Sequence, residues 1–204
     1  MHISEGVLSA PVLIGGAAFT VAGLAVSLKK LRPAEVPKVA MFCVVFFLAS
    51  LLHVPLGPGN VHLVLAGLLG AVLGLNAVVA IFAALLLQGV LLQFGGLSTL
   101  GVNTFNMAAP AVLLFLCLGR VLNGSSNGAA MLAAFVIGSL SLLLSAALLA
   151  LCLWLSGEEF LPAAKLLFVA ECPLALLEGL ITLVCVKFLR KVKPELLPKF
   201  KSAA

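Results

Sequence analysis

The amino end of this chain and its three histidines are the groups that could bind a metal ion. The sequence opens Met1-His2-Ile3, and we expect Met1 to be retained because a bulky residue follows it. The free amine, the backbone nitrogen of His2 and a ring nitrogen of His2 then lie within chelating reach of one ion. A further imidazole would complete a plane of four nitrogens. Such a plane suits nickel(II) and copper(II), with cobalt(II) as another occupant, whereas zinc prefers a tetrahedron and magnesium or calcium prefers oxygen.

Two histidines are candidates for the fourth ligand. His53 and His62 flank the sequence Pro55-Leu56-Gly57-Pro58-Gly59, which is typical of a sharp turn. The spacing leaves both histidines open as the ligand. A histidine beside an initiator methionine is often accidental, but three histidines predicted on one side of a protein with 9% charged residues favour a metal site.

The elements that must position these groups are membrane helices. The chain has 204 residues, of which 63% are hydrophobic, and a mean hydropathy of +1.30. A soluble domain could not bury this much apolar surface. We predict an all-α polytopic membrane helix bundle, a single transmembrane metal-binding domain over residues 1–204, with about seven transmembrane helices. The segments are 7–28, 37–56, 60–75, 77–93, 103–122, 127–155 and 160–190. A six-helix count stays open, because only a weak breaker separates 60–75 from 77–93.

The distribution of basic residues predicts the orientation. With the N terminus outside and seven crossings, every lysine and arginine except Lys165 falls on the inner side, as the positive-inside tendency requires. Six crossings would place the two basic ends on opposite sides. We therefore predict a multi-pass protein of the cell inner (plasma) membrane with a cytoplasmic C terminus. The net charge of +5 reflects topology and contact of the basic tail with membrane lipid, and no nucleic-acid partner is expected.

Four stretches resemble a known family. MHISEG at 1–6, PGNVHLVLAG at 58–67, FGGLSTLGVNTFNMA at 94–108 and PLALLEGLIT at 173–182 are similar, in the same order, to the CbiM/NikM family, the substrate-binding component of energy-coupling-factor transporters for cobalt or nickel. The likeness covers almost the whole chain. Its specific part is the pairing of a Met-His-Ile start with a downstream histidine in a glycine-containing loop.

The resemblance implies a ligand set and a group of partners. Helix 1 would thread its N terminus back into the bundle, and the transported Co²⁺ or Ni²⁺ would be held by the Met1 amine, the His2 backbone nitrogen, the His2 ring and His62. His53 would either touch the ion or orient a ligand. The implied partners are a transmembrane coupling (T) component, two cytoplasmic ATPase subunits and a small accessory membrane subunit. The chain has no GxxxxGK[ST] motif, so we expect a transport component that is not an enzyme and has no cofactor.

Polar residues in the matching stretches would support the site. The expected hydrogen-bond partners around it are Asn60, Gln93, Ser98, Thr99, Asn103 and Asn106. For Asn60 and Asn103, capping of a helix is the alternative role. Phe94 stands where relatives often have an acidic residue, which removes one carboxylate from this side.

Two glutamates in the last predicted helix suggest an alternative function. Glu171 and Glu178 are seven residues apart and share a helix face. Glu178 matches the Glu-Gly of the family, which implies structural pairing or contact with a partner subunit, and we expect Glu171 to be solvated near the outer end. The alternative is an ion-coupled secondary permease with both glutamates as proton carriers. A membrane enzyme with a histidine-bound metal and an assembly subunit without a ligand also stay open.

Overall fold

The computed structural model describes residues 2–51, 53–56, 59–124 and 126–198, and the side chains of residues 52–61 and 123 lie outside that description. Seven α-helices and one short hairpin make up most of the described chain. The helices are α1 (Ala10–Lys30), α2 (Val36–Ala49), α3 (Ala66–Leu73), α4 (Ala77–Leu92), α5 (Leu100–Gly124), α6 (Asn127–Ser156) and α7 (Leu161–Val192). The strands are β1 (His53–Leu56) and β2 (Gly59–His62). The four short 3-10 helices are η1 (Pro33–Glu35), η2 (Gly74–Asn76), η3 (Glu158–Phe160) and η4 (Pro194–Leu196).

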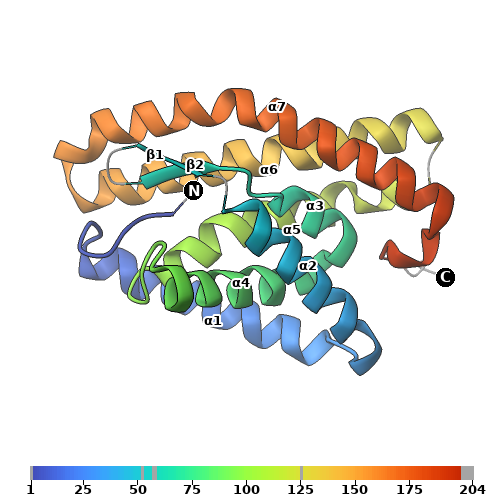
Figure 1. Cartoon of the computed structure of the whole chain (residues 1–204), viewed down its shortest axis with the longest axis horizontal. Coiled ribbons are helices and arrows are strands. Elements are labelled where there is room, and N and C mark those ends of the chain that lie inside the picture. The colour runs from blue at the N-terminus through green and yellow to red at the C-terminus, as the bar shows by residue number, and fades with distance from the viewer. Residues whose placement is uncertain (1, 52, 57–58, 125, 199–204) are drawn as a thin grey trace.

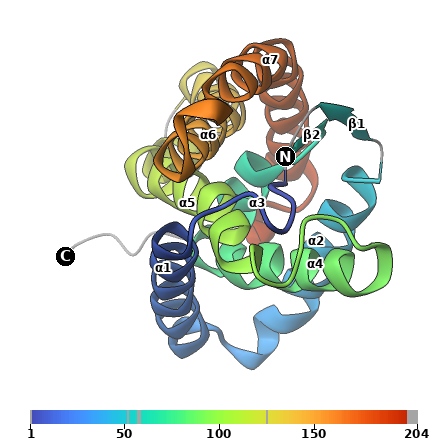
Figure 2. The same ribbon diagram turned by 90° about the vertical axis from the view of Figure 1, so that its left-hand side faces the viewer.

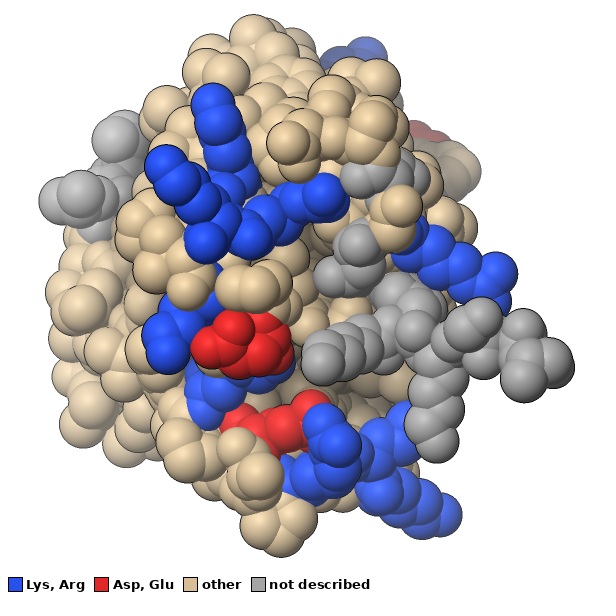
Figure 3. Space-filling view, turned by 90° about the vertical axis from the view of Figure 1, so that its right-hand side faces the viewer, with Lys and Arg blue, Asp and Glu red and all other residues tan. Residues whose placement is uncertain are grey.

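The long helices run along the long axis of the molecule (Figure 1). The segment before α1, the hairpin and the connection between α4 and α5 gather at one end, which we call the hairpin end (Figures 1 and 2). The connection between α1 and α2 and the C-terminal end of α7 lie at the opposite end. That end carries lysine and arginine side chains, including Lys29 and Lys30 in the last turn of α1 and Arg190 and Lys191 in that of α7 (Figure 3). We call it the basic end.

The helices confirm an all-α polytopic membrane bundle. Within the described residues, five stretches are long and apolar enough to cross a membrane: 10–30, 66–92, 100–122, 127–156 and 158–192. The stretch 66–92 combines α3 and α4, and α2 has only 14 residues. The prediction that the chain crosses seven times with its N terminus outside therefore stays a prediction.

Two predicted helices are wrong at the hairpin. The segment predicted as helix 37–56 ends at Ala49, and the segment predicted as helix 60–75 begins as β2 and becomes helical only at Ala66. Pro55 has no N–H to donate in a helix, and the Gly-Pro-Gly sequence that follows breaks helical geometry. The strands pair antiparallel with His53 opposite His62. This pairing satisfies backbone groups that would otherwise be costly inside a membrane protein.

Close backbone contacts hold α3 at the centre of the bundle. Every residue of α3 is buried. A Cβ added at Gly67 would lie 2.6 Å from the Cα of Gly138 in α6, and one added at Gly70 would lie 2.6 Å from the carbonyl oxygen of Ala111 in α5. Lipid provides no hydrophobic drive between helices, so contacts of this kind supply the packing energy. They fix the position of the residues that immediately precede α3.

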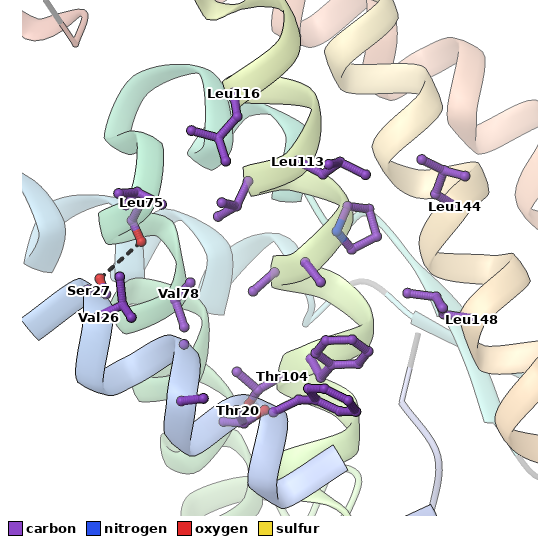
Figure 4. Close-up of a pocket in the computed structure, with 18 of the residues that line it drawn as sticks. Thr20, Val26, Ser27, Leu75, Val78, Thr104, Leu113, Leu116, Leu144 and Leu148 are labelled. Carbon is purple, nitrogen blue, oxygen red and sulfur yellow. Dashed lines mark hydrogen bonds between the residues drawn. The ribbon is translucent and has the colours of Figure 1, made fainter. Parts of the chain in front are cut away.

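An apolar groove runs between α1 and α6, with α5 as its floor (Figure 4). Its volume is about 790 Å³, and its polar members include Thr20, Ser27 and Thr104. The hydroxyl of Ser27 donates to the carbonyl oxygen of Leu75 at 3.0 Å, which ties α1 to the 3-10 turn before α4. Of the histidines whose side chains are described, neither His2 nor His62 lines this groove.

Candidate metal site

The segment before α1 is held inside the hairpin end by side chains from the start of α5. Asn103 binds both backbone groups of Ile3: its Oδ1 accepts from the Ile3 N–H at 3.0 Å, and its Nδ2 donates to the Ile3 carbonyl oxygen at 3.1 Å. The hydroxyl of Thr99 donates to the same carbonyl oxygen at 2.9 Å. Ile3, Thr99 and Asn103 are all buried. A buried amide that satisfies a backbone donor and acceptor together fixes the position of the chain at His2 and Ile3.

The connection between α4 and α5 closes over the same segment. The Ser98 N–H donates to Oε1 of Glu5 at 3.1 Å. Gly95 has φ of +77°, which L side chains rarely adopt. A Cβ added at Gly96 would lie 1.9 Å from Cγ of Glu5. The two glycines therefore allow this loop to lie directly against residues 2–5.

His2 and His62 meet at this point. Their rings stack with centroids 4.7 Å apart and an interplanar angle of 25°. Both residues are buried, each with 2% exposure. Nδ1 of His62 lies 3.0 Å from the Leu63 carbonyl oxygen, which can only accept a hydrogen bond. When His62 is neutral and donates to this oxygen from Nδ1, its lone pair is on Nε2, the arrangement that a metal-ligating histidine needs.

Glu178 fixes the residues that follow His62. Oε1 of this α7 residue accepts from the N–H groups of Val64 and Leu65, the second at 2.9 Å. Leu65 precedes α3 with φ of 58°, an uncommon conformation for a side chain of this size. A carboxylate at this position also faces the positive end of α3. Glu178 thus anchors the polypeptide two residues beyond His62.

The structure brings together only some of the residues predicted to support the site. Thr99, Asn103 and, through its backbone, Ser98 contact the N-terminal segment. Asn103 lies within α5 and does not cap it. Gln93 is exposed in a left-handed conformation at the end of α4. The side-chain amide of Asn106 lies 3.7 Å from Sγ of Cys152 in α6.

Other predicted site residues lie partly or wholly outside the description. Met1 is outside the described residues. His53 and Asn60 are described only in their backbone, where His53 pairs with His62 and Asn60 with Pro55. Among the residues described, no group of three or more His, Cys, Asp or Glu could hold a metal ion.

The prediction for Glu171 is wrong. It was expected to be solvated, but it is 1% exposed. Neither of its carboxylate oxygens has a hydrogen-bond partner among the described residues. Glu171 and Glu178 were predicted to share a helix face, and both are buried in α7. The position of Glu171 near the start of the predicted helix could not show that other parts of the fold cover this residue.

Sequence reasoning did not give Glu5 a role at the site. Glu5 receives the Ser98 N–H and packs against Gly96. Its signal in the sequence was the Gly95-Gly96 pair, which indicates close approach of another backbone or side chain. The spacing of residues alone could not show that Glu5 is the residue that packs against the connection between α4 and α5.

Comparisons with known proteins identify the family of the chain. The family described as "Cobalt uptake substrate-specific transmembrane region" (CbiM) matches residues 2–196. The chain is 38% identical over 199 residues to a protein of Haemophilus influenzae named "Putative metal transport protein", covering 97% of each. It is 31% identical over 214 residues to the cobalt transport protein CbiM of Kyrpidia tusciae, covering 98% of this chain and 87% of that protein.

A solved structure shares the fold. The crystal structure of a transition metal transporter superposes with a TM-score of 0.81 and 28% sequence identity, covering 94% of this chain and 93% of the other. The resemblance of the four sequence stretches is thus confirmed over nearly the whole chain. From the family match over residues 2–196 and the relatives matched along most of their length, the chain belongs to the CbiM family.

Proposed function

We propose that this protein is the substrate-binding membrane component of an ATP-driven, energy-coupling-factor uptake transporter for divalent cobalt or nickel. The observation that carries the proposal is the buried pair of His2 and His62, whose rings stack 4.7 Å apart beside a clamped N-terminal segment. The family description and the names of the relatives, cobalt uptake and metal transport, support the same assignment.

The proposed ligands are four nitrogens. They are the Met1 amine, the backbone nitrogen of His2, a ring nitrogen of His2 and Nε2 of His62. The bonds from Asn103 and Thr99 to Ile3 would hold the first three in place, and the bonds from Glu178 to Val64 and Leu65 would hold the fourth. With metal–nitrogen distances of about 2.0 Å, a shared ion would require the two ring nitrogens to lie within about 4 Å of each other. His53 lies opposite His62 in the hairpin, and we propose that it either touches the ion or orients one of these ligands.

Proton competition sets the expected pH dependence. An imidazole or an amine binds a metal only in its neutral form, so the ion and protons compete for the same lone pairs. Affinity for cobalt or nickel should therefore fall as the medium becomes acidic. Coordination by the backbone nitrogen of His2 would also displace its proton, which strengthens this dependence.

Transport would need partner subunits. The sequence has no phosphate-binding loop, so ATP would be hydrolysed by two cytoplasmic ATPase subunits and the motion passed on through a transmembrane coupling component. A small accessory membrane subunit completes the proposed assembly. In this scheme the protein is not an enzyme. It lies in the plasma membrane with its hairpin end outside, captures the ion there and is reoriented to release it inside.

The decisive experiment changes the amino end. We expect purified protein with an authentic Met1, verified by mass spectrometry, to bind cobalt or nickel tightly in a titration. One extra residue ahead of Met1 should abolish high-affinity binding, because it displaces the amine from the chelate. One extra residue added after Ala204 serves as the matched control. An N-terminally extended protein that binds as tightly as the authentic one contradicts the proposed ligand set.

The burial of Glu171 favours a second candidate. A carboxylate that is 1% exposed within a candidate membrane span is costly and is usually functional. An ion-coupled permease that uses Glu171 and Glu178 as proton carriers would transport metal in vesicles without ATPase subunits and would lose coupling on Glu178→Gln. Under the first proposal, uptake requires the ATPase subunits.

A further inference from the structure

The basic end contains a cavity that fits the phosphate of a membrane lipid. It lies between the start of α6 and the last turns of α7, has a volume of about 370 Å³ and is lined by Asn127, Met131, Lys187, Arg190 and Lys191. Three of these five residues are cationic and none is acidic. The cavity belongs to the basic end, where lysine and arginine side chains gather on the surface (Figure 3). A cavity with this lining attracts anions.

Arg190 organises the cavity. Its guanidinium donates to the Leu122 carbonyl oxygen near the end of α5, and Nη2 lies 3.4 Å from Oδ1 of Asn127 at the start of α6. The arginine therefore joins three helices at this point. The positive end of the 30-residue helix α6 faces the same space.

Among the residues that the structure describes, no acidic side chain neutralises the two lysines. Within the described residues Lys187 and Lys191 form no salt bridge. At the basic end, Glu35 pairs with Arg32 and Glu195 pairs with Lys193. Glu171 and Glu178 are buried within α7, and the remaining acidic residues, Glu5, Glu158 and Glu159, belong to the hairpin end. Residues 199–204 carry no acidic side chain.

The lysines also repel one another. Lys187 and Lys191 are four residues apart on α7, a spacing at which like charges are neighbours and destabilise a helix. An anion placed between them would convert this repulsion into two attractions. The arrangement thus gains from a bound anion that the chain itself does not provide.

The surroundings indicate a lipid as the source of that anion. The cavity lies where the candidate membrane span 158–192 ends, which is where we expect lipid headgroups. Met131 forms its apolar side, and the exposed side chains of Val184 and Phe188 lie on the same turns of α7. A phosphate attached to acyl chains can occupy the basic cavity and the adjacent apolar surface together. We propose that this cavity is a binding site for the phosphate of an anionic phospholipid.

The test uses the full-length protein purified in neutral detergent. Phosphatidylglycerol, with phosphatidylcholine of the same acyl chains for comparison, is titrated while bound lipid is counted by native mass spectrometry and Tm is followed. We expect saturable binding of phosphatidylglycerol with a rise in Tm and weaker binding of phosphatidylcholine. The double variant K187Q/K191Q should bind phosphatidylglycerol about tenfold more weakly or worse.

Matched variants separate the site from charge in general. K29Q/K30Q removes the same charge from the last turn of α1 without touching the cavity, and we expect its lipid affinity to stay within about twofold of the wild type. K187R/K191R keeps the charge and should retain binding. Equal binding of both lipids, or an equal loss in K29Q/K30Q, overturns the proposal. Displacement of the lipid by millimolar inorganic phosphate overturns the lipid assignment in favour of a soluble anion.

The two proposals fail independently. Metal affinity should be the same in the wild type and in K187Q/K191Q, because the cavity and the histidines lie at opposite ends of the bundle (Figures 1 and 3). The lipid-induced rise in Tm should likewise persist in His62→Ala. A result in which K187Q/K191Q loses metal binding and lipid binding together contradicts a separate lipid site.

Discussion

The two ends of the bundle use polar residues in opposite ways. At the hairpin end, buried side chains bind the backbone of a distant segment, as Asn103 binds Ile3 and Glu178 binds Leu65. At the basic end, the charged pairs Arg32–Glu35 and Lys193–Glu195 join close neighbours in the sequence, and most of these groups are exposed. Water can replace these two exposed ion pairs, but it cannot replace the buried bonds from Asn103 and Glu178 at the hairpin end. The buried bonds therefore fix the geometry of the hairpin end, and the basic end carries the proposed contact with lipid.

The largest expected effect is at the histidine pair. Replacing His62 with alanine removes a proposed ligand and should weaken cobalt or nickel binding by more than about 100-fold, above the loss typical for residues that only orient a ligand. His53→Ala changes the residue opposite in the hairpin and should weaken binding by less than about tenfold. Metal titration of both purified variants measures the difference. Equal losses would contradict the assignment of His62 as the ligand.

The next effect is on stability at the centre of the bundle. Gly67→Ala places a methyl group 2.6 Å from the Cα of Gly138, and the resulting overpacking should lower the free energy of unfolding by about 1–3 kcal/mol. Gly128→Ala serves as the control, because a Cβ there meets no atom within 4 Å. Unfolding in detergent, followed by circular dichroism, measures both. A neutral Gly67→Ala would show that α3 can shift, and the hairpin end would then be less rigid than we describe.

The third effect tests whether the clamp on Ile3 acts on metal binding. Asn103→Leu removes both bonds to the Ile3 backbone and should weaken metal binding by about tenfold. Thr20→Val is the matched control, because the Thr20 hydroxyl binds the Gly101 carbonyl oxygen of α5 at 2.6 Å without touching residues 2–5. It should lower Tm and leave metal affinity unchanged. If both variants lose affinity equally, the loss reflects packing of α5 and not the clamp.

The smallest effect is at the basic end. A hydrogen bond from Arg32 holds the pKa of Glu35 below its ordinary value. Glu35 therefore stabilises the fold above the ordinary carboxyl pKa, and this contribution is lost as the pH falls toward the lowered pKa of the folded state. Glu35→Gln should remove a small part of the acid-induced decrease in Tm. Thermal scans of both proteins across the acidic range test this. An unchanged pH dependence would show that solvent screens the pair completely.

The helices were predictable from the sequence because lipid imposes one requirement on every crossing. Runs of about 20 apolar residues, ended by charged or glycine-rich connections, gave α1, α5, α6 and α7 to within a few residues. The hairpin was missed because its strands are short and apolar, so the run 37–56 reads as one helix. Pro55 and Pro58 marked a break there, but not strand pairing.

The candidate site was predictable in its residue types but not in its contacts. The Met-His-Ile start and His62 could be singled out, since few other side chains in this chain can bind a metal. The bonds of Asn103 and Thr99 to Ile3 join residues about 100 positions apart, and no local pattern encodes such pairs. The left-handed conformations of Leu65 and Gln93 are imposed by tertiary structure. Glycine is the usual sequence indicator of this conformation, and neither position has one. Glu171 was misjudged for the same reason.

The bonds from Glu178 to the amides of Val64 and Leu65 have a mechanical consequence. They couple the middle of a 32-residue helix to a point only two residues from the His62 ring. If a neighbouring subunit tilts α7, the force reaches His62 across a short and stiff connection, while Asn103 keeps His2 attached to α5. The two imidazoles are thus attached to different helices, His62 to α7 and His2 to α5. A movement of α7 relative to α5 would separate the two rings.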